Sequence, residues 1–479
     1  MKFMSLRPSN RIRSVKATHG RVRELGFGLV VVGVCALGCS SDDGAARGQQ
    51  IPDAGADSQV QSDAAGSDAG LDAQTPQDAA TDSAPTGCQD VDCGNFGKCV
   101  EAAGTASCQC DLGYHAQGLS CVLDPCTGAA CPRSVSDWQK LYDAEWSAKD
   151  EADCLSRAKS GGFKQEHYFL AYCIDGLTSI WRATGDNQYL DTTLEYIQYT
   201  LDDAKLASDG FRRCPGDIDP KGVPLWESYY WRMVTTLIRV MQKHPTLLST
   251  GTYQAQYDAL LKFSEHDIWD KWESDGLGNL YRSRTHMASH WARIGMELFR
   301  ITGKAKYKTV FDNISGGTMV GYPSNLHDQF YPNPKTPTAY TWASVWGAPK
   351  GQDVQDTSHA GAIISFIELA AEAGMYWQQS DLDSLHSTLT DVVWPAPQGQ
   401  NYFRNVDGTG GLYGPKPGNT IDGIHGRLNE WLVLGRHDLK LQKRIEADYT
   451  GNHLKYFGTQ SLGIAALNAK ILIDGKPAY

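Results

Sequence analysis

Two histidines and three arginines are concentrated in the stretch Leu280–Arg293, which reads LYRSRTHMASHWAR. If a helix begins near Thr285, His286 and His290 lie four residues apart and Arg293 follows one turn later, so these three side chains share one face. Imidazoles held beside guanidinium groups suit proton transfer on an anionic substrate. No glutamate lies between the histidines as in His-Glu-x-x-His, which argues against a metal site. We predict an active-site segment that uses no metal and no other cofactor, with a purely structural role for the histidines as the alternative.

A second polar stretch, Asp353–Gly361, also runs directly into an apolar helical segment. Asp356 or Thr357 is placed to cap that helix, and His359 then falls in its first turn. Two helix starts that both carry imidazole predict one shared cleft, in which Asp356 contacts the substrate.

Further candidates lie in two aromatic-rich segments. Glu227, Tyr230 and Trp231 stand near the start of a predicted helix at 224–243, where they form either a sugar subsite or ordinary core packing. Tyr340 lies in the loop YTWASVWG, which follows a proline-rich run and is a plausible wall for a cleft. We predict Tyr340 as a candidate catalytic phenol.

The first 86 residues predict export and tethering. Basic residues precede the apolar run 25–38, the pattern of a secretion signal over residues 1–39. The segment Ala36-Leu-Gly-Cys39 resembles a bacterial lipobox, although Ala36 stands where leucine is usual. This resemblance implies lipidation of Cys39, with membrane contact only through that anchor and a location in the cell envelope or outside the cell. Residues 40–86 are rich in Asp, Ala, Gly and Ser and predict a disordered linker.

Six cysteines follow within residues 87–125, and CQCDLGY has the Cys-x-Cys-x-x-Gly-Tyr form. This segment resembles an epidermal-growth-factor-like module. The resemblance implies the pairs Cys88–Cys99, Cys93–Cys108 and Cys110–Cys121. Five cysteines remain beyond it: Cys126 and Cys131 plausibly pair, whereas the pairing among Cys154, Cys173 and Cys214 is left open.

Residues 132–479 predict a mostly α-helical domain, because long apolar-periodic segments dominate and alternating strand patterns are few. The predicted helices cover 135–159, 164–184, 187–205, 224–243, 252–272, 286–302, 304–314, 358–374, 380–392, 421–435 and 457–473. Several helices end at Thr-Gly or Ala-Gly before a new helix, as a left-handed C-cap requires. Repeated helix hairpins of this kind predict an all-α fold, an (α/α)n toroid, with an open α-solenoid as the alternative.

Two segments carry a resemblance to a family. Thr285–Gly303, together with DTSHAGAIISFIELA from Asp356 to Ala370, resembles the α/α-toroid polysaccharide lyases that cleave alginate and glucuronan. The resemblance implies β-elimination from a uronic-acid polymer. Arg284, His286 or a protonated Glu227 would mask the uronate charge, His290 or His359 would remove the proton, and Tyr340 would act on the leaving-oxygen side. Thr285-His286 replaces the usual Asn-His of these lyases, and Ser358-His359 replaces the usual His-Tyr.

Two other functions remain open. DTSHA is also similar to the catalytic segment of unsaturated glucuronyl hydrolases, which implies Asp356 as general acid–base and Asp217, Asp219 or Glu227 as its partner. A tethered carbohydrate-binding lipoprotein is the non-enzymatic alternative. The net charge of −11 and the lack of a basic stripe argue against nucleic acid. No motif of serine hydrolases or nucleotide enzymes is present. We expect a monomer that acts on an anionic polysaccharide, bound through Arg284, Arg293, Glu227, Tyr230, Trp231 and Asp356.

Overall fold

The computed structural model describes residues 87–88, 91, 93, 97–102, 104–110, 114–123, 131–160, 164–214, 224–396, 401–413, 428–448 and 458–475. All of them belong to one compact unit, Thr81–Tyr479. The predicted export signal (1–39) and linker (40–86) lie outside the described residues. Within the described ranges, no helix combines the length and the apolar character needed to span a bilayer.

The small N-terminal module consists of two antiparallel hairpins. Strand β1 (Gly97–Ala102) pairs with β2 (Thr105–Cys110), and β3 (Tyr114–Gln117) pairs with β4 (Ser120–Leu123). Disulfides join Cys88 to Cys99, Cys93 to Cys108 and Cys110 to Cys121, the three pairs implied by the sequence resemblance. Because such short strands bury little apolar surface, cross-links of this kind stabilise the module.

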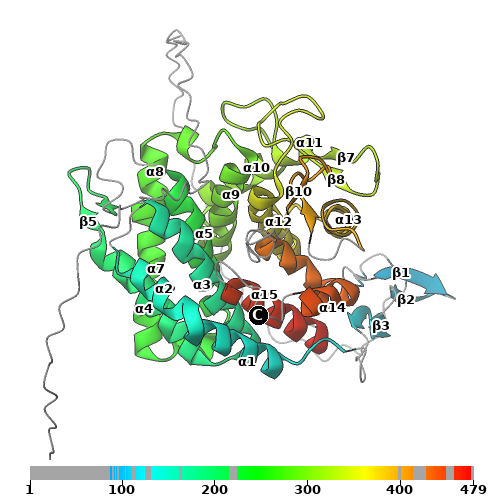
Figure 1. The fold of residues 1–479 in the computed structure, drawn as a ribbon, viewed down its shortest axis with the longest axis horizontal. Coiled ribbons are helices and arrows are strands. Elements are labelled where there is room, and N and C mark those ends of the chain that lie inside the picture. The colour runs from blue at the N-terminus through cyan, green and yellow to red at the C-terminus, as the bar shows by residue number, and fades with distance from the viewer. Residues whose placement is uncertain are drawn as a thin grey trace, which may run out of the picture. The chain divides into compact units, whose positions relative to one another are not determined.

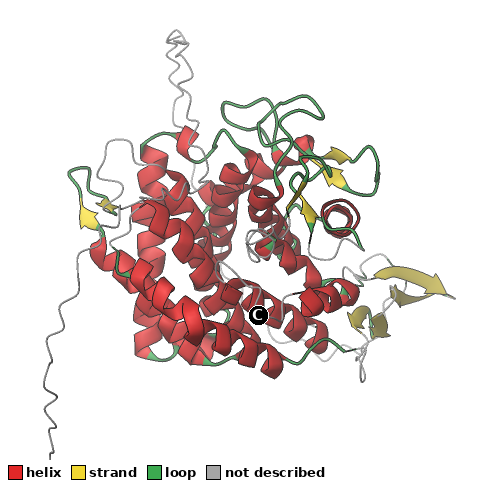
Figure 2. Ribbon diagram, viewed as in Figure 1, coloured by secondary structure: helices red, strands yellow, loops and turns green. Residues whose placement is uncertain are grey.

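The remaining described chain is mostly helical (Figure 2). The main helices are α1 (Val135–Glu145), α2 (Glu151–Ala158), α3 (Lys164–Thr184), α4 (Asn187–Asp203), α5 (Pro224–Gln242), α7 (Gly251–Phe263), α9 (Thr285–Thr302), α10 (Ala305–Ser315), α12 (Thr357–Glu372), α13 (Gln379–Ser387), η7 (Asn429–Arg436), α14 (Leu439–Asp448) and α15 (Gly458–Asp474). Short helices are η2 (Trp146–Asp150), α6 (Pro245–Leu248), η4 (Ser264–Asp270), α8 (Lys271–Ser274), η5 (Leu277–Asn279), α11 (Leu326–Gln329) and η6 (Thr388–Val393). Most predicted ranges are confirmed to within two residues. Helix α14 lies outside the predicted ranges, and the described part of the predicted helix 421–435 is a 3-10 helix.

Six inner helices pack in a closed ring in the order α3, α5, α9, α12, η7 and α15, and α15 returns to pack against α3. Each inner helix also contacts an outer one: α4 packs on α3, α7 on α5, α10 on α9, α13 on α12, α14 on η7 and α1 on α15. Figure 1 shows α3, α5, α9, α12 and α15 around a common centre, with α4 and α7 outside them. The fold is an all-α toroid, as predicted, and the contact of α15 with α3 excludes an open solenoid.

Glycines permit the ring to close and the helices to end. A Cβ atom on Gly463 of α15 would lie 2.5 Å from the carbonyl oxygen of Gly176 on α3, so the two helices could not approach as they do with larger residues. Gly185 and Gly303 follow α3 and α9 with φ of +72°, the left-handed conformation expected of a C-cap. The sequence pattern Thr-Gly was therefore interpreted correctly.

The remaining cysteines lie in the helical domain. A disulfide joins Cys154 of α2 to Cys173 of α3. The sequence had left this pairing open. Cys131 is disulfide-bonded, and Cys214 is buried. Cys126 lies outside the described residues, so its pairing with Cys131 stays a prediction. Four disulfides join pairs of described cysteines, and cross-links of this kind are typical of an exported protein.

Loops and short hairpins tie together the N-terminal ends of α9 and α12. The short strands of the helical domain are β5 (Lys205–Leu206) and β6 (Arg212–Arg213), which lie between α4 and α5, and β7 (Tyr331–Pro332), β8 (Tyr340–Thr341), β9 (Tyr402–Phe403) and β10 (Leu412–Tyr413). Arg284, just before α9, bridges to Val345, and Asp356, just before α12, bridges to Asn405. The Thr285 hydroxyl donates to Oε1 of Gln355 (3.0 Å). The two helix starts are therefore fixed relative to each other.

Candidate functional site

Three histidines and one aspartate meet where α9 and α12 begin. The rings of His286 and His359 are 4.4 Å apart between centroids, and those of His286 and His290 are 6.3 Å apart. His359 Nδ1 lies 2.7 Å from Asp356 Oδ2. We call His286, His290, His359 and Asp356 the imidazole cluster. The two polar helix starts that the sequence predicted to lie together do meet at these residues.

Asp356 is the N-cap of α12, one of the two residues predicted for that position. Its Oδ1 accepts from the His359 backbone N–H (3.1 Å), and its Oδ2 also accepts from Gln355 Nε2 (3.1 Å). Burial alone would raise the pKa of this carboxyl, but hydrogen bonds and charge from His359 hold that pKa well below its ordinary value. The side chains of Asp356 and His359 are 36% and 28% exposed. Asp356 is thus an ionised carboxylate that solvent can reach, and it fixes the orientation of His359.

His290 and His286 occupy the deeper part of the cluster. His290 is 1% exposed, its Nδ1 lies 3.3 Å from the Ser228 hydroxyl, and its ring meets that of Tyr229 at 5.1 Å. His290 Nε2 and His286 Nδ1 are buried, and neither has a hydrogen-bond partner among the described residues. Burial, with nearby positive groups, lowers the pKa of both imidazoles well below the ordinary value. Both rings are therefore neutral near pH 7, and each retains a nitrogen able to exchange a proton.

Below the cluster a buried ionic network joins four inner helices. Arg232 of α5 donates to both oxygens of Glu430 on η7, each at 2.7 Å, and Glu430 also accepts from Ser365 of α12 (2.7 Å). Arg293 of α9 donates to the Thr236 hydroxyl from Nε and Nη2 (3.1 and 3.0 Å). Burial opposes the charge on Glu430, but Arg232 holds its pKa below the ordinary value. We call this network of Arg232, Glu430, Ser365, Arg293 and Thr236 the ionic floor of the cluster.

Aromatic side chains from α3 and α5 continue the surface of the cluster. Tyr168 stacks on Tyr229 at 4.1 Å and meets Trp226 edge-on at 5.5 Å, while Tyr172 contacts both Tyr168 and Tyr229 at 5.7 Å. We call Tyr168, Tyr172, Trp226 and Tyr229 the aromatic wall. Tyr168, Tyr172 and Trp226 are half-buried, whereas Tyr229 is buried. Because Tyr229 contacts His290, wall and cluster are continuous.

Asp175 of α3 also faces the centre of the ring, and the sequence analysis did not single it out. Gln460 Nε2 of α15 donates to its Oδ2 (2.7 Å), and its other oxygen has no hydrogen-bond partner among the described residues. Burial raises the pKa of Asp175, Arg293 opposes that rise, and Glu430 adds to it. A usable signal was present, because Tyr168, Tyr172 and Asp175 repeat the i, i+4, i+7 spacing of His286, His290 and Arg293.

Several predicted substrate contacts lie in the helix packing instead. Glu227 is 2% exposed and accepts from Lys271 Nζ (2.8 Å) and from Trp272 Nε1 (2.6 Å). Tyr230 stacks on His167, and Trp231 packs against Phe263; both are 1% exposed. For Tyr230 and Trp231 the alternative of core packing therefore describes the observed environment. Among the described residues, helix packing encloses all three side chains.

Tyr340 and two arginines are likewise engaged away from the imidazole cluster. The Tyr340 hydroxyl donates to Asp381 (3.0 Å), and its ring stacks on Phe330 at 5.0 Å. Burial and the Asp381 charge raise the pKa of Tyr340 to about 12. Arg284 donates to the Ser344 hydroxyl (3.3 Å) at the start of α9, and Arg293 belongs to the buried floor. None of the three hydrogen-bonds to the cluster among the described residues, although, beside burial, the charge of Arg284 contributes to the lowered pKa of His286.

No group of three or more His, Cys, Asp or Glu side chains within the described ranges has a geometry that could hold a metal ion. The expected lack of a metal or cofactor stays a prediction. Asp217 and Asp219, the predicted carboxylate partners of Asp356, lie outside the described residues.

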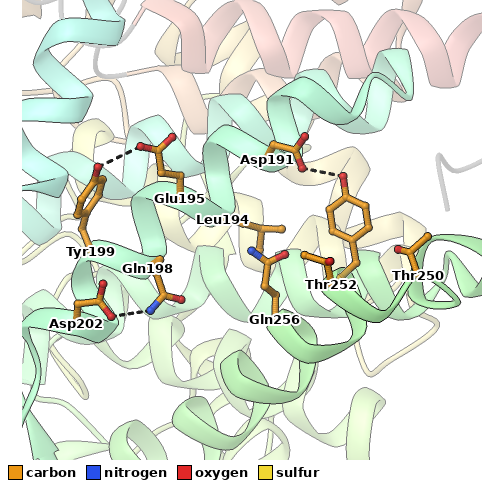
Figure 3. Close-up of a pocket in the computed structure, with 10 residues that line it drawn as sticks. Asp191, Leu194, Glu195, Gln198, Tyr199, Asp202, Thr250, Thr252 and Gln256 are labelled. Carbon is orange, nitrogen blue, oxygen red and sulfur yellow. Dashed lines mark hydrogen bonds between the residues drawn. The ribbon is translucent and has the colours of Figure 1, made fainter.

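A separate surface pocket of about 600 Å³ lies between the outer helices α4 and α7 (Figure 3). Its carboxylates are already bonded: Tyr253 donates to Asp191 (2.7 Å) and Tyr199 to Glu195 (3.1 Å). This pocket contains no residue of the imidazole cluster, so it is separate from the candidate site.

Fold and site together define an α/α toroid whose inner helices carry a cluster of imidazole and carboxylate groups. No protein-family model and no curated protein matches this chain. Among solved structures it is similar to the α-1,6-mannanase GH76A of Salegentibacter sp. HEL1_6, at 13% identity and a TM-score of 0.38, over 70% of this chain and 100% of that one. An inactive variant of that mannanase with two aspartates replaced, in complex with α-1,6-mannotetrose, gives 13% identity and a TM-score of 0.39 over 70% and 99%.

These findings correct the predicted function. The solved structures that the chain resembles are mannanases, which are glycoside hydrolases, and not alginate or glucuronan lyases. The positions of Glu227 and Tyr340 agree with this correction, because the lyase scheme used Glu227 to mask a uronate and Tyr340 on the leaving-oxygen side, and both are occupied by other partners. The assignment as a carbon–oxygen lyase is therefore wrong.

Proposed function

We propose that the helical domain is a glycoside hydrolase in which Asp356 is an essential carboxylate. The observation that carries the proposal is the contact of Asp356 with His359 at the start of α12, where a charged, accessible carboxylate holds one imidazole beside the neutral ring of His286. This corresponds to the glycosidase alternative of the sequence analysis, with one change. Because its pKa is lowered, Asp356 supplies the ionised group and not the proton donor.

Hydrolysis of a glycosidic bond requires a second group that protonates the departing oxygen. Among the described carboxyl groups that face the centre of the ring, Glu430 is held by Arg232 and Glu368 by Arg436. Asp175 has no ion pair within hydrogen-bonding distance, is partly exposed and has a raised pKa. We assign proton donation to Asp175, while Asp356 and His359 activate the attacking water on the other side of the bond.

The substrate proposed is a polysaccharide or oligosaccharide, and its predicted anionic character stays a prediction. The test is incubation of the purified chain with a panel that includes α-1,6-mannan, alginate and glucuronan, followed by assay of new reducing ends. Release of reducing sugar without ultraviolet absorbance from an unsaturated uronate supports the proposal. Binding of a glycan without any cleavage would instead support the carbohydrate-binding alternative, and no binding and no cleavage across the panel would reject both.

The N-terminal part adds the proposal of an anchored enzyme. The disulfides agree with export, and lipidation of Cys39 would place the helical domain at the envelope, with residues 40–86 as tether and residues 87–125 as an epidermal-growth-factor-like module. Metabolic labelling with a palmitate analogue should mark the wild type and leave the variant Cys39→Ala unmarked. Label that persists in the variant would show that Cys39 is not the modified residue.

A further inference from the structure

We propose that Tyr168, Tyr172 and Trp226 form a stacking subsite for one neutral hexopyranose ring of the glycan, immediately beside the imidazole cluster. The inference rests on the proposed function, because it assigns the substrate contacts of the same site. It concerns residues from α3 and α5 that the catalytic scheme does not use.

The three rings are more exposed than their neighbours. Most large side chains on the inner helices are fully buried, as Trp231 and Trp291 are at 1% and 0% exposure. Tyr168, Tyr172 and Trp226 keep part of their surface exposed although they adjoin this core. Partly exposed aromatic surface beside a polar cluster suits the apolar C–H face of a sugar ring.

The rings are also held in place from behind. The ring of Tyr229 supports Tyr168 from behind with an interplanar angle of 18°. Tyr229 is itself held, because its hydroxyl donates to Glu430 (3.1 Å) and the Arg232 guanidinium lies 4.1 Å from its ring centroid. A wall fixed by the ionic floor loses little conformational freedom when a ligand binds.

Continuity and charge also favour a neutral sugar. Tyr229 contacts both Tyr168 and the ring of His290, so the wall and the imidazole cluster share one ring. Among described residues, the cation nearest to Tyr229 is Arg232, and both of its terminal nitrogens are committed to Glu430. The wall therefore presents aromatic surface, which suits a neutral ring better than a uronate.

The test measures equilibrium binding by tryptophan fluorescence and calorimetry, with α-1,6-mannotetraose as neutral probe and a mannuronate tetrasaccharide as anionic probe. The protein carries Asp356→Asn so that the probes are not consumed. Trp226→Ala in this background should weaken binding of the neutral probe by about tenfold, the loss of one stacked contact. Trp226→Phe keeps a flat face and should recover most of the affinity. Tyr199→Ala, which removes a half-buried tyrosine from the outer pocket of Figure 3, should leave affinity unchanged.

Each outcome decides between the subsite and its alternatives. Binding that is unaffected by Trp226→Ala, or that is lost with Tyr199→Ala, would overturn the subsite, as would the failure of both probes to bind at millimolar concentration. Tighter binding of the anionic probe would overturn the assignment to a neutral ring. Thermal melting of each variant identifies loss of fold, and in that case Tyr172→Phe, which removes only a hydroxyl, gives the second measurement. Loss of binding on Trp226→Ala without hydrolysis by the wild type would leave the subsite standing and reject the proposed function.

Discussion

Replacement of Asp356 by asparagine separates the chemical role of this residue from its structural one. Asparagine is as good an N-cap as aspartate, so its side-chain oxygen can still accept from the His359 backbone N–H. In the wild type this hydrogen bond measures 3.1 Å. The substitution removes the negative charge, and it places an amide where Oδ2 accepts from His359 Nδ1 at 2.7 Å. His359 then loses its orienting acceptor, and the ionised carboxylate is gone.

The expected magnitudes differ sharply between activity and stability. Loss of a proton-transfer group lowers kcat by roughly a hundredfold to ten-thousandfold. The free energy of unfolding should fall by about 1–2 kcal/mol, because the cap is retained but the charge-assisted hydrogen bond to His359 is lost. The assay is initial-rate reducing-sugar release at saturating substrate, with urea unfolding on the same preparation.

The matched control is Asp186→Asn at the start of α4. Asp186 is an exposed N-cap that accepts from the Gln188 backbone N–H at 3.1 Å, and it is not part of the imidazole cluster. It should show a stability change no larger than that of Asp356→Asn, with unchanged kcat. Wild-type activity in Asp356→Asn, or an activity loss matched by the fraction unfolded, would refute the assignment of Asp356.

Three further predictions use the buried groups. Because the pKa values of His286 and His290 are lowered in the folded protein, the unfolded chain binds more protons below about pH 6.5; stability should fall as pH drops below that value, and His290→Gln should reduce the slope in urea titrations. Glu430→Gln leaves the buried guanidinium of Arg232 without its charge partner and should cost about 3–5 kcal/mol in unfolding free energy. Asp175→Asn should greatly slow cleavage of natural glycans but spare aryl glycosides whose leaving group needs no proton.

Controls and contrary outcomes are available for each. Asp137→Asn breaks the exposed pair with Lys140 (2.8 Å) and should change the unfolding free energy very little, so an equally small loss for Glu430→Gln would contradict the description of the ionic floor. A flat stability profile between pH 4 and 6.5 would mean that the histidines are not buried as described. Equal loss on activated and natural substrates would remove Asp175 from the role of proton donor.

Local sequence signals predicted the helices and the meeting of the histidines well. Capping residues and left-handed glycines are read from a few neighbouring positions, so the start of α12 at Asp356 and the ends of α3 and α9 could be predicted without tertiary information. His286 and His359 meet because each stands in the first turn of an inner helix, at the same end of the ring. That follows from topology once a toroid is assumed.

Partners distant in sequence could not be predicted. Glu227 and Lys271 lie 44 residues apart, and Tyr340 and Asp381 lie 41 apart, so nothing local reveals that their polar groups are already paired. Helix α5 is apolar or aromatic on most positions, which left its rotation about the ring undetermined. Trp231 was therefore predicted as a substrate contact although it faces the core, whereas Trp226, which belongs to the wall, was not.

The central claim is that this chain cleaves glycans by adding water. The most direct measurement is mass spectrometry of the products formed from a defined oligosaccharide that the wild type degrades, with Asp356→Asn as the inactive reference. We predict product pairs whose masses sum to that of the substrate plus one water, with no such products from the variant. Products whose masses sum to that of the substrate alone, one of them carrying an unsaturated end, would show elimination and contradict the account.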